Sequence, residues 1–150
     1  MVLISNRRAK YDYDIKKKLT AGVVLTGPEV KSLRNKNGSL QGSYVKIINH
    51  EAWLINAQIN PYRYAQQEGY DPKRTRKLLL TKKQIFQLLE YQQAKNAVIV
   101  PLAFELIDNQ IKVKIGIGRG KKQYEKRKKL KQKDLEKRMQ KRFKKKNLKL

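Results

Sequence analysis

The residues of this chain best suited to chemistry are its lysines and arginines, which gather in two places. Lys73, Arg74, Arg76 and Lys77 lie within five consecutive positions. Residues 118–150 hold 17 Lys or Arg against three acidic residues, and the whole chain has a formal net charge of +25. Clustered cations of this kind bind polyanions, because they neutralise phosphates and release counterions. The sequence therefore predicts a binding surface for a polyanion such as a nucleic acid.

Residues for catalysis or metal binding are sparse. The chain has no cysteine and a single histidine, His50, which falls in a polar stretch typical of a turn. No grouping of histidines and carboxylates suggests the geometry of a metal site, and no nucleophile has a base beside it. We therefore expect a protein that is not an enzyme and that uses neither a metal nor a cofactor.

A glycine-rich segment near the start of the basic C-terminal region could be mistaken for a phosphate loop. Gly116, Gly118 and Gly120 precede Lys121 and Lys122. A nucleotide-binding loop would be followed by an apolar crossover helix and a second strand, whereas this segment leads into a charged tail. The interpretation is therefore a flexible exit from the folded domain.

Eight tyrosines offer flat rings between the basic residues. A base stacked on such a ring contributes about 1–3 kcal/mol to binding. Tyr44 and Tyr91 fall in regular elements and are predicted to pack in the fold. Tyr124 lies among lysines and is predicted to stack, while the sequence does not separate the remaining tyrosines.

Short apolar runs between turn residues indicate a mainly β chain. Strands are expected over residues 22–27, in a hairpin over 40–60, over 97–107 and over 111–115. Pro101 favours an edge or a bulge in the third of these, because proline cannot donate to a strand ladder. Strict alternation in the last strand leaves one face basic and wet.

Helix signals occur at two places between the strands. Pro28 and Glu29 begin a short helix over residues 28–36, and a T-x-x-Q capping box at Thr81 begins a second helix that ends near residue 95. Residues 61–77 lack an apolar period and read as a long basic loop.

These elements predict a mainly β fold with flanking helices: a small antiparallel OB-like β-barrel over residues 1–117, followed by a basic tail over 118–150. The tail is expected to be disordered when free, because like charges repel and few apolar residues are interspersed. No apolar run approaches the length of a membrane span, so a soluble, cytoplasmic protein is expected.

The tail also carries an apolar stripe at helical spacing. Leu135, Met139 and Phe143 recur every four residues on an otherwise basic template. Such a stripe could enter a membrane interface, a partner groove or an RNA groove. The basic character of the preceding domain favours RNA, and no membrane contact is expected.

Five segments, in order, resemble one known family. They are residues 6–13 (NRRAKYDY), 21–22 (AG), 27–34 (GPEVKSLR), 71–80 (DPKRTRKLLL) and 120–127 (GKKQYEKR). They resemble the SsrA-binding proteins (small protein B) of bacterial trans-translation.

The resemblance implies a barrel related to the OB-fold that binds the tRNA-like domain of transfer-messenger RNA. It implies delivery of that RNA, with elongation factor Tu, to stalled ribosomes for rescue and tagging of the nascent peptide. It further implies that the tail becomes helical in the empty message channel, near the decoding centre of the small subunit. A monomer is expected.

The same resemblance predicts the contact residues. The RNA-binding set is Asn6, Arg7, Lys10, Gly22, Glu29, Lys31, Arg34, Arg74, Arg76, Lys77, Leu79, Lys121 and Lys122. The ribosome-contacting set is Tyr124, Lys126 and Arg127. Two interpretations remain open for Glu29: it accepts hydrogen bonds from base or ribose donors, or it satisfies the amides at the start of its own helix.

Two departures from the family pattern limit the transfer. Members often have Asp at the position of Glu125, and many carry an acidic residue at the position of Thr20, so neither residue is given a role. The alternative to the family function is a general basic RNA-binding or ribosomal protein without specificity for tRNA shape.

Overall fold

One antiparallel sheet of seven strands forms the framework of the protein. In the computed structural model, which describes residues 1–65, 68–94, 97–120 and 132–141, the strand order is β1-β8-β9-β2-β7-β5-β4. The sheet strands are β1 (Val2–Ser5), β2 (Tyr13–Val23), β4 (Tyr44–Ile48), β5 (Glu51–Ile55), β7 (Arg76–Leu79), β8 (Ala97–Ile107) and β9 (Gln110–Gly120). A second, two-stranded sheet pairs β3 (Gly38–Ser39) with β6 (Gln58–Ile59). Within residues 1–120 the helices are α1 (Arg7–Asp12), α2 (Gly27–Arg34) and α3 (Lys82–Gln93).

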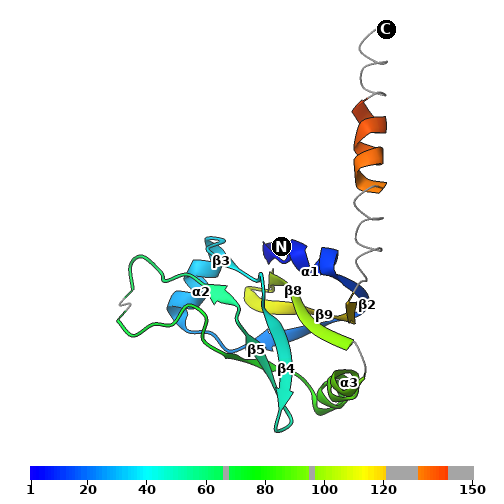
Figure 1. The fold of residues 1–150 in the computed structure, drawn as a ribbon. Coiled ribbons are helices and arrows are strands. Elements are labelled where there is room, and N and C mark those ends of the chain that lie inside the picture. Colours follow the sequence, from blue (N-terminus) through cyan, green and yellow to red (C-terminus); the bar gives the residue numbers. More distant parts are fainter. Residues whose placement is uncertain (66–67, 95–96, 121–131, 142–150) are drawn as a thin grey trace. The chain divides into compact units, whose positions relative to one another are not determined.

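The large sheet curls strongly, so that β4 at one end also contacts β8 near the other end (Figure 1). Its inner face holds the core, to which β9 contributes alternate residues from Ile111 to Ile117. Leu33 of α2 and Leu88 of α3 are fully buried in the same core. The predicted mainly β, antiparallel fold with flanking helices is confirmed.

Two features predicted from short sequence motifs, a helix cap and a strand irregularity, are present in the structure. Thr81 caps α3 as predicted, and a second capping box joins Thr26 and Glu29 at the start of α2. The predicted irregularity at Pro101 is also present, because the pairing of β8 with β9 shifts register between Pro101 and Ala103.

The N-terminal part of the chain differs most from expectation. Residues 22–27 were predicted to form a strand, but the strand in this region, β2, spans eleven residues from Tyr13 and ends at Val23. Three consecutive lysines, Lys16 to Lys18, hide the alternation in this strand. Pairing with β9 along almost its whole length stabilises β2 in spite of that composition.

The glycine-rich segment is a second correction, because Gly116, Gly118 and Gly120 belong to β9 and do not form a flexible exit. Gly116 and Gly118 are buried beside Leu102 and the backbone of β2. A Cβ atom built on Gly118 would lie 2.0 Å from the Asp14 carbonyl oxygen. The missing side chain therefore permits β2 and β9 to approach closely where the register of their pairing shifts.

The chain divides into two compact units, residues 1–120 and 121–150. In the second unit, residues 132–141 are helical, and the side chains of Leu135 and Met139 are exposed. Phe143, the third residue of the predicted stripe, lies outside the described residues. None of the helices described is long and apolar enough to cross a membrane.

The close approach at Gly118 generates a stability prediction. Gly118→Ala should lower the free energy of unfolding by about 2 kcal/mol or more, because backbone atoms of β2 would have to move. Gly120→Ala is the matched control, since no atom lies within 4 Å of a Cβ at that position. Urea denaturation of both variants checks this, and equal midpoints would contradict the close contact.

Candidate nucleic-acid interface

The solvent-facing side of the curled sheet brings three of the predicted RNA-binding residues together. Leu79 of β7 is paired in register with Gly22 of β2, and Lys77 lies two residues before Leu79 on the same side of the strand. Leu79 is 55% exposed, and no side chain projects from Gly22 beside it. The result is a flat patch with one apolar residue and an adjacent cation.

Register extends this patch across neighbouring strands. Lys112 is paired with Gly22, Lys114 with Thr20, and Trp53 with Lys77. Lys46 is paired with Trp53 on the far side. We call the surface formed by Gly22, Lys46, Trp53, Lys77, Leu79, Lys112 and Lys114 the basic sheet face.

Sequence reasoning found only part of this face. Alternation predicted a basic side for the strand carrying Lys112 and Lys114, but did not connect it with Lys77. Lys46 and Trp53 were not singled out, although both occupy the solvent side of an alternating strand. Two carboxylates, Glu51 and Glu105, also lie on this side, and Glu51 forms an ion pair of 3.6 Å with Lys77. Cations still outnumber acids on the face.

The remaining exposed cations of the predicted set lie on helices. Lys31 and Arg34 are exposed on α2, and Arg7 and Lys10 on α1. Because α2 contacts β1 and β6 while α1 contacts β2 and β8, the two helices place their cations at different parts of the sheet (Figure 1). The set therefore forms more than one cluster.

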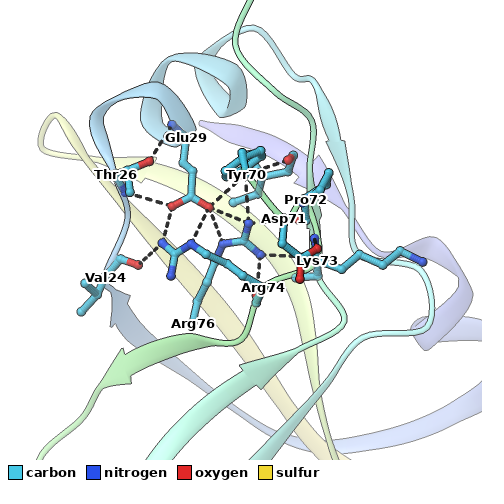
Figure 2. A network of polar contacts seen from close by, with 11 residues as sticks. Val24, Thr26, Glu29, Tyr70, Asp71, Pro72, Lys73, Arg74 and Arg76 are labelled. Atoms are coloured by element: carbon cyan, nitrogen blue, oxygen red, sulfur yellow. Dashed lines mark hydrogen bonds and ion pairs between the residues drawn. The ribbon is translucent and has the colours of Figure 1, made fainter. Parts of the chain in front are cut away.

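A buried polar network joins α2 to the segment that leads into β7 (Figure 2). Its centre is Glu29, which is 1% exposed. The Oε1 atom of Glu29 accepts a hydrogen bond of 2.9 Å from the amide of Thr26 at the helix start. The guanidinium of Arg74 donates to both carboxylate oxygens, with Nε 3.1 Å from Oε2. The carboxylate is thus fully occupied within the protein.

Arg76 is the second partner of Glu29 and is 0% exposed. Its Nε donates to Glu29 Oε2 at 2.8 Å, and its Nη1 donates to the carbonyl oxygens of Ala57 at 2.7 Å and Arg74 at 3.0 Å. Its Nη2 donates to the carbonyl oxygen of Pro72 at 3.1 Å. We refer to Glu29, Tyr70, Arg74 and Arg76 as the buried clamp.

Tyr70 completes the buried clamp. Its hydroxyl lies 3.1 Å from Glu29 Oε2 and 2.9 Å from the carbonyl oxygen of Ile59, and it accepts from Arg76 Nη2 at 3.2 Å. Burial and the negative charge of Glu29 raise the pKa of Tyr70, against the opposing charge of Arg76. The hydroxyl therefore stays protonated and is available as a donor.

The buried clamp keeps Glu29 ionised. Burial by itself raises the pKa of a carboxylate, but hydrogen bonds from Arg74, the Thr26 amide and Arg76, together with the Arg76 charge, outweigh that effect. The pKa of Glu29 falls from 4.5 to about 2. The second interpretation of Glu29, a carboxylate that satisfies its own helix start, is thus present in the structure, and two arginines extend it.

Asn6 has a comparable role at the other end of the sheet. Its Nδ2 atom donates to the carbonyl oxygens of Pro101 at 2.8 Å and Leu40 at 3.3 Å, and its Oδ1 accepts from the amide of Ala9. It therefore caps α1 and satisfies one carbonyl group at the bulge of β8 and another in the segment between β3 and β4.

Three members of the predicted RNA-binding set are buried in the structure. Asn6, Glu29 and Arg76 are 5%, 1% and 0% exposed, and their polar atoms are engaged inside the protein. In the structure these three residues join parts of the protein to one another, and direct contact with RNA at each of them stays a prediction. Arg74 keeps 32% of its side chain exposed while it pairs with Glu29. Lys121, Lys122, Tyr124, Glu125, Lys126 and Arg127 lie outside the described residues.

Nothing in the described part of the chain groups three or more His, Cys, Asp or Glu residues as a metal site would require. His50 occupies the predicted turn between β4 and β5, with φ of 60°, and its ring lies 6.0 Å from that of Phe86.

Comparisons with known proteins agree on one family. Residues 3–145 match the family model described as SmpB protein. A protein of Sulfurihydrogenibium sp. (strain YO3AOP1) named SsrA-binding protein is 46% identical over 143 residues, covering 95% of this chain and 94% of that protein. The SsrA-binding protein of Aquifex aeolicus (strain VF5) is 44% identical over 95% of this chain and 91% of its own.

A solved structure shares the fold as well. A chain in the structure described as "tmRNA-SmpB: a journey to the center of the bacterial ribosome" is 39% identical and superposes with a TM-score of 0.68, covering 79% of this chain and 84% of that chain.

The buried clamp generates a prediction for stability against pH. Glu29→Gln should cost about 3–5 kcal/mol at pH 7, because it leaves Arg76 buried without its counter-charge. Since the pKa of Glu29 is lowered to about 2 in the folded protein, its contribution is complete above pH 4.5 and is lost as the pH falls toward 2. Denaturant unfolding of the wild type should therefore show a steeper loss of stability over this range than the variant.

Glu51→Gln is the matched control, because the pair of Glu51 with Lys77 is long and about half exposed. It should cost no more than about 1 kcal/mol. Equal costs at the two positions would show that Glu29 does not hold α2 to β7.

Proposed function

Because the chain belongs to the SmpB protein family, we propose that it binds the tRNA-like domain of transfer-messenger RNA and delivers this RNA to stalled ribosomes in trans-translation. The observation that carries the proposal is the basic sheet face, in which cations from three strands surround the flat Gly22–Leu79 pair. The curated relatives are named for binding SsrA RNA, and the structural neighbour is described together with tmRNA and the ribosome.

The chemistry of the face fits an RNA elbow. Exposed lysines contact phosphates without reading sequence, and they supply the salt-dependent part of affinity. Leu79 offers an apolar surface to a base or a ribose, and Gly22 beside it adds no side chain that would keep the backbone away. Folded RNA is recognised mostly by shape, through surfaces of this kind.

The buried clamp holds together two elements that carry exposed groups of this surface. Glu29 and Arg76 fix α2, with its exposed Lys31 and Arg34, to the start of β7, which carries Lys77 and Leu79. The distance between the RNA-facing groups on α2 and those on β7 is thereby fixed. We assign Lys31, Arg34, Lys77, Leu79 and Gly22 to the RNA contact, and Arg7 and Lys10 of α1 to a separate contact.

The tail completes the proposed mechanism on the ribosome. Lys121 and Lys122 continue the RNA contact, and Tyr124, Lys126 and Arg127 meet the small subunit near the decoding centre. The rest of the tail enters the message channel. Elongation factor Tu accompanies the charged RNA, and the protein acts as a cytoplasmic monomer that binds and positions RNA without catalysing a reaction.

Competition binding tests the proposal directly. The full chain should bind the tRNA-like domain at least about tenfold more tightly than ordinary tRNA or duplex RNA of equal mass at physiological salt. Lys77→Ala should weaken binding and reduce the dependence of log Kd on log salt by about one unit, whereas Lys82→Ala on α3 should change neither. Equal affinity for all three RNAs would favour the alternative, a general basic RNA-binding protein.

Deleting residues 121–150 separates the two halves of the proposal. Residues 1–120 form a compact unit with its own core, so this fragment should keep most of its affinity for the tRNA-like domain. In a reconstituted translation system with stalled ribosomes, it should fail to support tagging. A fragment that fails to bind the RNA, or one that still supports tagging, would contradict this division.

A further inference from the structure

Tyr64 is the most exposed tyrosine among the described residues, and it lies outside the basic sheet face. Tyr64, in the segment after β6, is 78% exposed, whereas Tyr44 and Tyr91 are 42% and 37% exposed. The two latter residues were predicted to pack, and each does so only in part. An aromatic ring left open to water to this extent gains nothing from the core.

Tyr64 belongs to an ordered group of rings and cations. Its ring centroid lies 5.6 Å from that of Tyr62, at an interplanar angle of 69°. The guanidinium of Arg63 lies 5.6 Å from the Tyr64 centroid, and Lys31 Nζ lies 5.4 Å from the Tyr62 centroid. Because Lys31 belongs to α2, this contact places the aromatic pair beside cations that we assign to the RNA contact.

A recess lies next to the pair. It has a volume of about 280 Å³ and is lined by Tyr62 and Tyr70 together with Pro28, Pro61 and Glu29 among others. Tyr70 and Glu29 are members of the buried clamp, so one wall of the recess is rigidly held. Glu68 also lines it, while the cations Lys31 and Arg63 lie beside the two rings and not in the lining of the recess.

We propose that Tyr64, supported by Tyr62, is a stacking site for an unpaired nucleobase of the bound RNA, with Lys31 and Arg63 holding the adjacent phosphates. The inference rests on the proposed function, because it assigns a further contact to the same RNA-binding surface. It names unpaired bases, in addition to helical shape, as a feature that this chain reads.

The charges of the group favour RNA as the occupant over an apolar peptide. Arg63 and Lys31 each lie over one ring, so a ligand reaching Tyr64 meets two positive charges. A nucleotide supplies both a flat base for the ring and a phosphate for the cations, and stacking of this kind accepts any base. Paired bases do not present their faces, so duplex RNA cannot use the site.

The test uses full-length protein and two probes: a single-stranded RNA oligonucleotide containing 2-aminopurine, and a fully paired RNA duplex of equal charge. Stacking on a ring should quench the 2-aminopurine emission. Tyr64→Ala should abolish most of this quenching and weaken single-stranded binding by about five- to 150-fold, while leaving duplex binding unchanged. Tyr64→Phe should behave as the wild type, because the ring is retained.

Tyr91→Ala, on α3, is the matched control and should change neither probe. Because Tyr64 is so exposed, its replacement should leave the unfolding midpoint unchanged, which separates lost stacking from misfolding. Equal weakening of both probes, unchanged quenching in Tyr64→Ala, or a Phe variant as weak as the Ala variant would each overturn the inference. Loss of preference for the tRNA-like domain by the wild type would instead overturn the proposed function, without bearing on quenching by the oligonucleotide.

Discussion

The arrangement of this protein depends on one ionised carboxylate that lies inside it. Glu29 and Arg76 are both buried, and each would be costly to bury alone, because removing a charge from water without a partner costs several kcal/mol. Together with Arg74 and Tyr70 they satisfy one another's hydrogen bonds. An apolar cluster of equal volume could be as stable, but it would not fix the orientation of α2 against β7, because apolar contacts have no preferred direction. The geometry of these hydrogen bonds sets one position of α2 against β7, and with it the spacing of the exposed groups that both elements carry.

This constraint also changes how the basic composition should be read. The cluster of Lys73, Arg74, Arg76 and Lys77 looks like a patch for phosphates, yet Arg76 is fully buried and Arg74 is paired with Glu29. Arginine suits the interior because its planar donors can satisfy a carboxylate and several carbonyl groups at once. The exposed positive charge of the surface comes mainly from lysines, whose mobile chains suit phosphate contacts. Net charge therefore overstates the number of cations that an RNA meets.

The sequence predicted features whose causes are local. The capping box at Thr81, the bulge at Pro101 and the alternation of Lys112 and Lys114 each depend on a few neighbouring residues. The buried clamp could not be predicted in the same way, since Glu29 and Arg76 are far apart in the chain and both residue types normally indicate surface. The resemblance found both residues but assigned them to RNA contact. Likewise, β2 has the composition of a loop but pairs as a strand. Its pairing with β9 explains why these residues form a strand.

A residue can thus be needed for binding in two physically different ways. Leu79 is exposed and Lys77 is half-buried, and both can meet a ligand directly, so their loss removes contacts one at a time. Asn6 and Glu29 meet only the protein, so their loss would disturb every contact on the elements they join. The two kinds of residue differ in whether the effects of their substitutions on binding free energy add. Losing one exposed contact leaves the other contacts in place, so the effects add, whereas a displaced helix changes several contacts at once and couples them. Additivity between substitutions on α2 and on β7 is therefore a direct measure of how rigidly the buried clamp holds the surface.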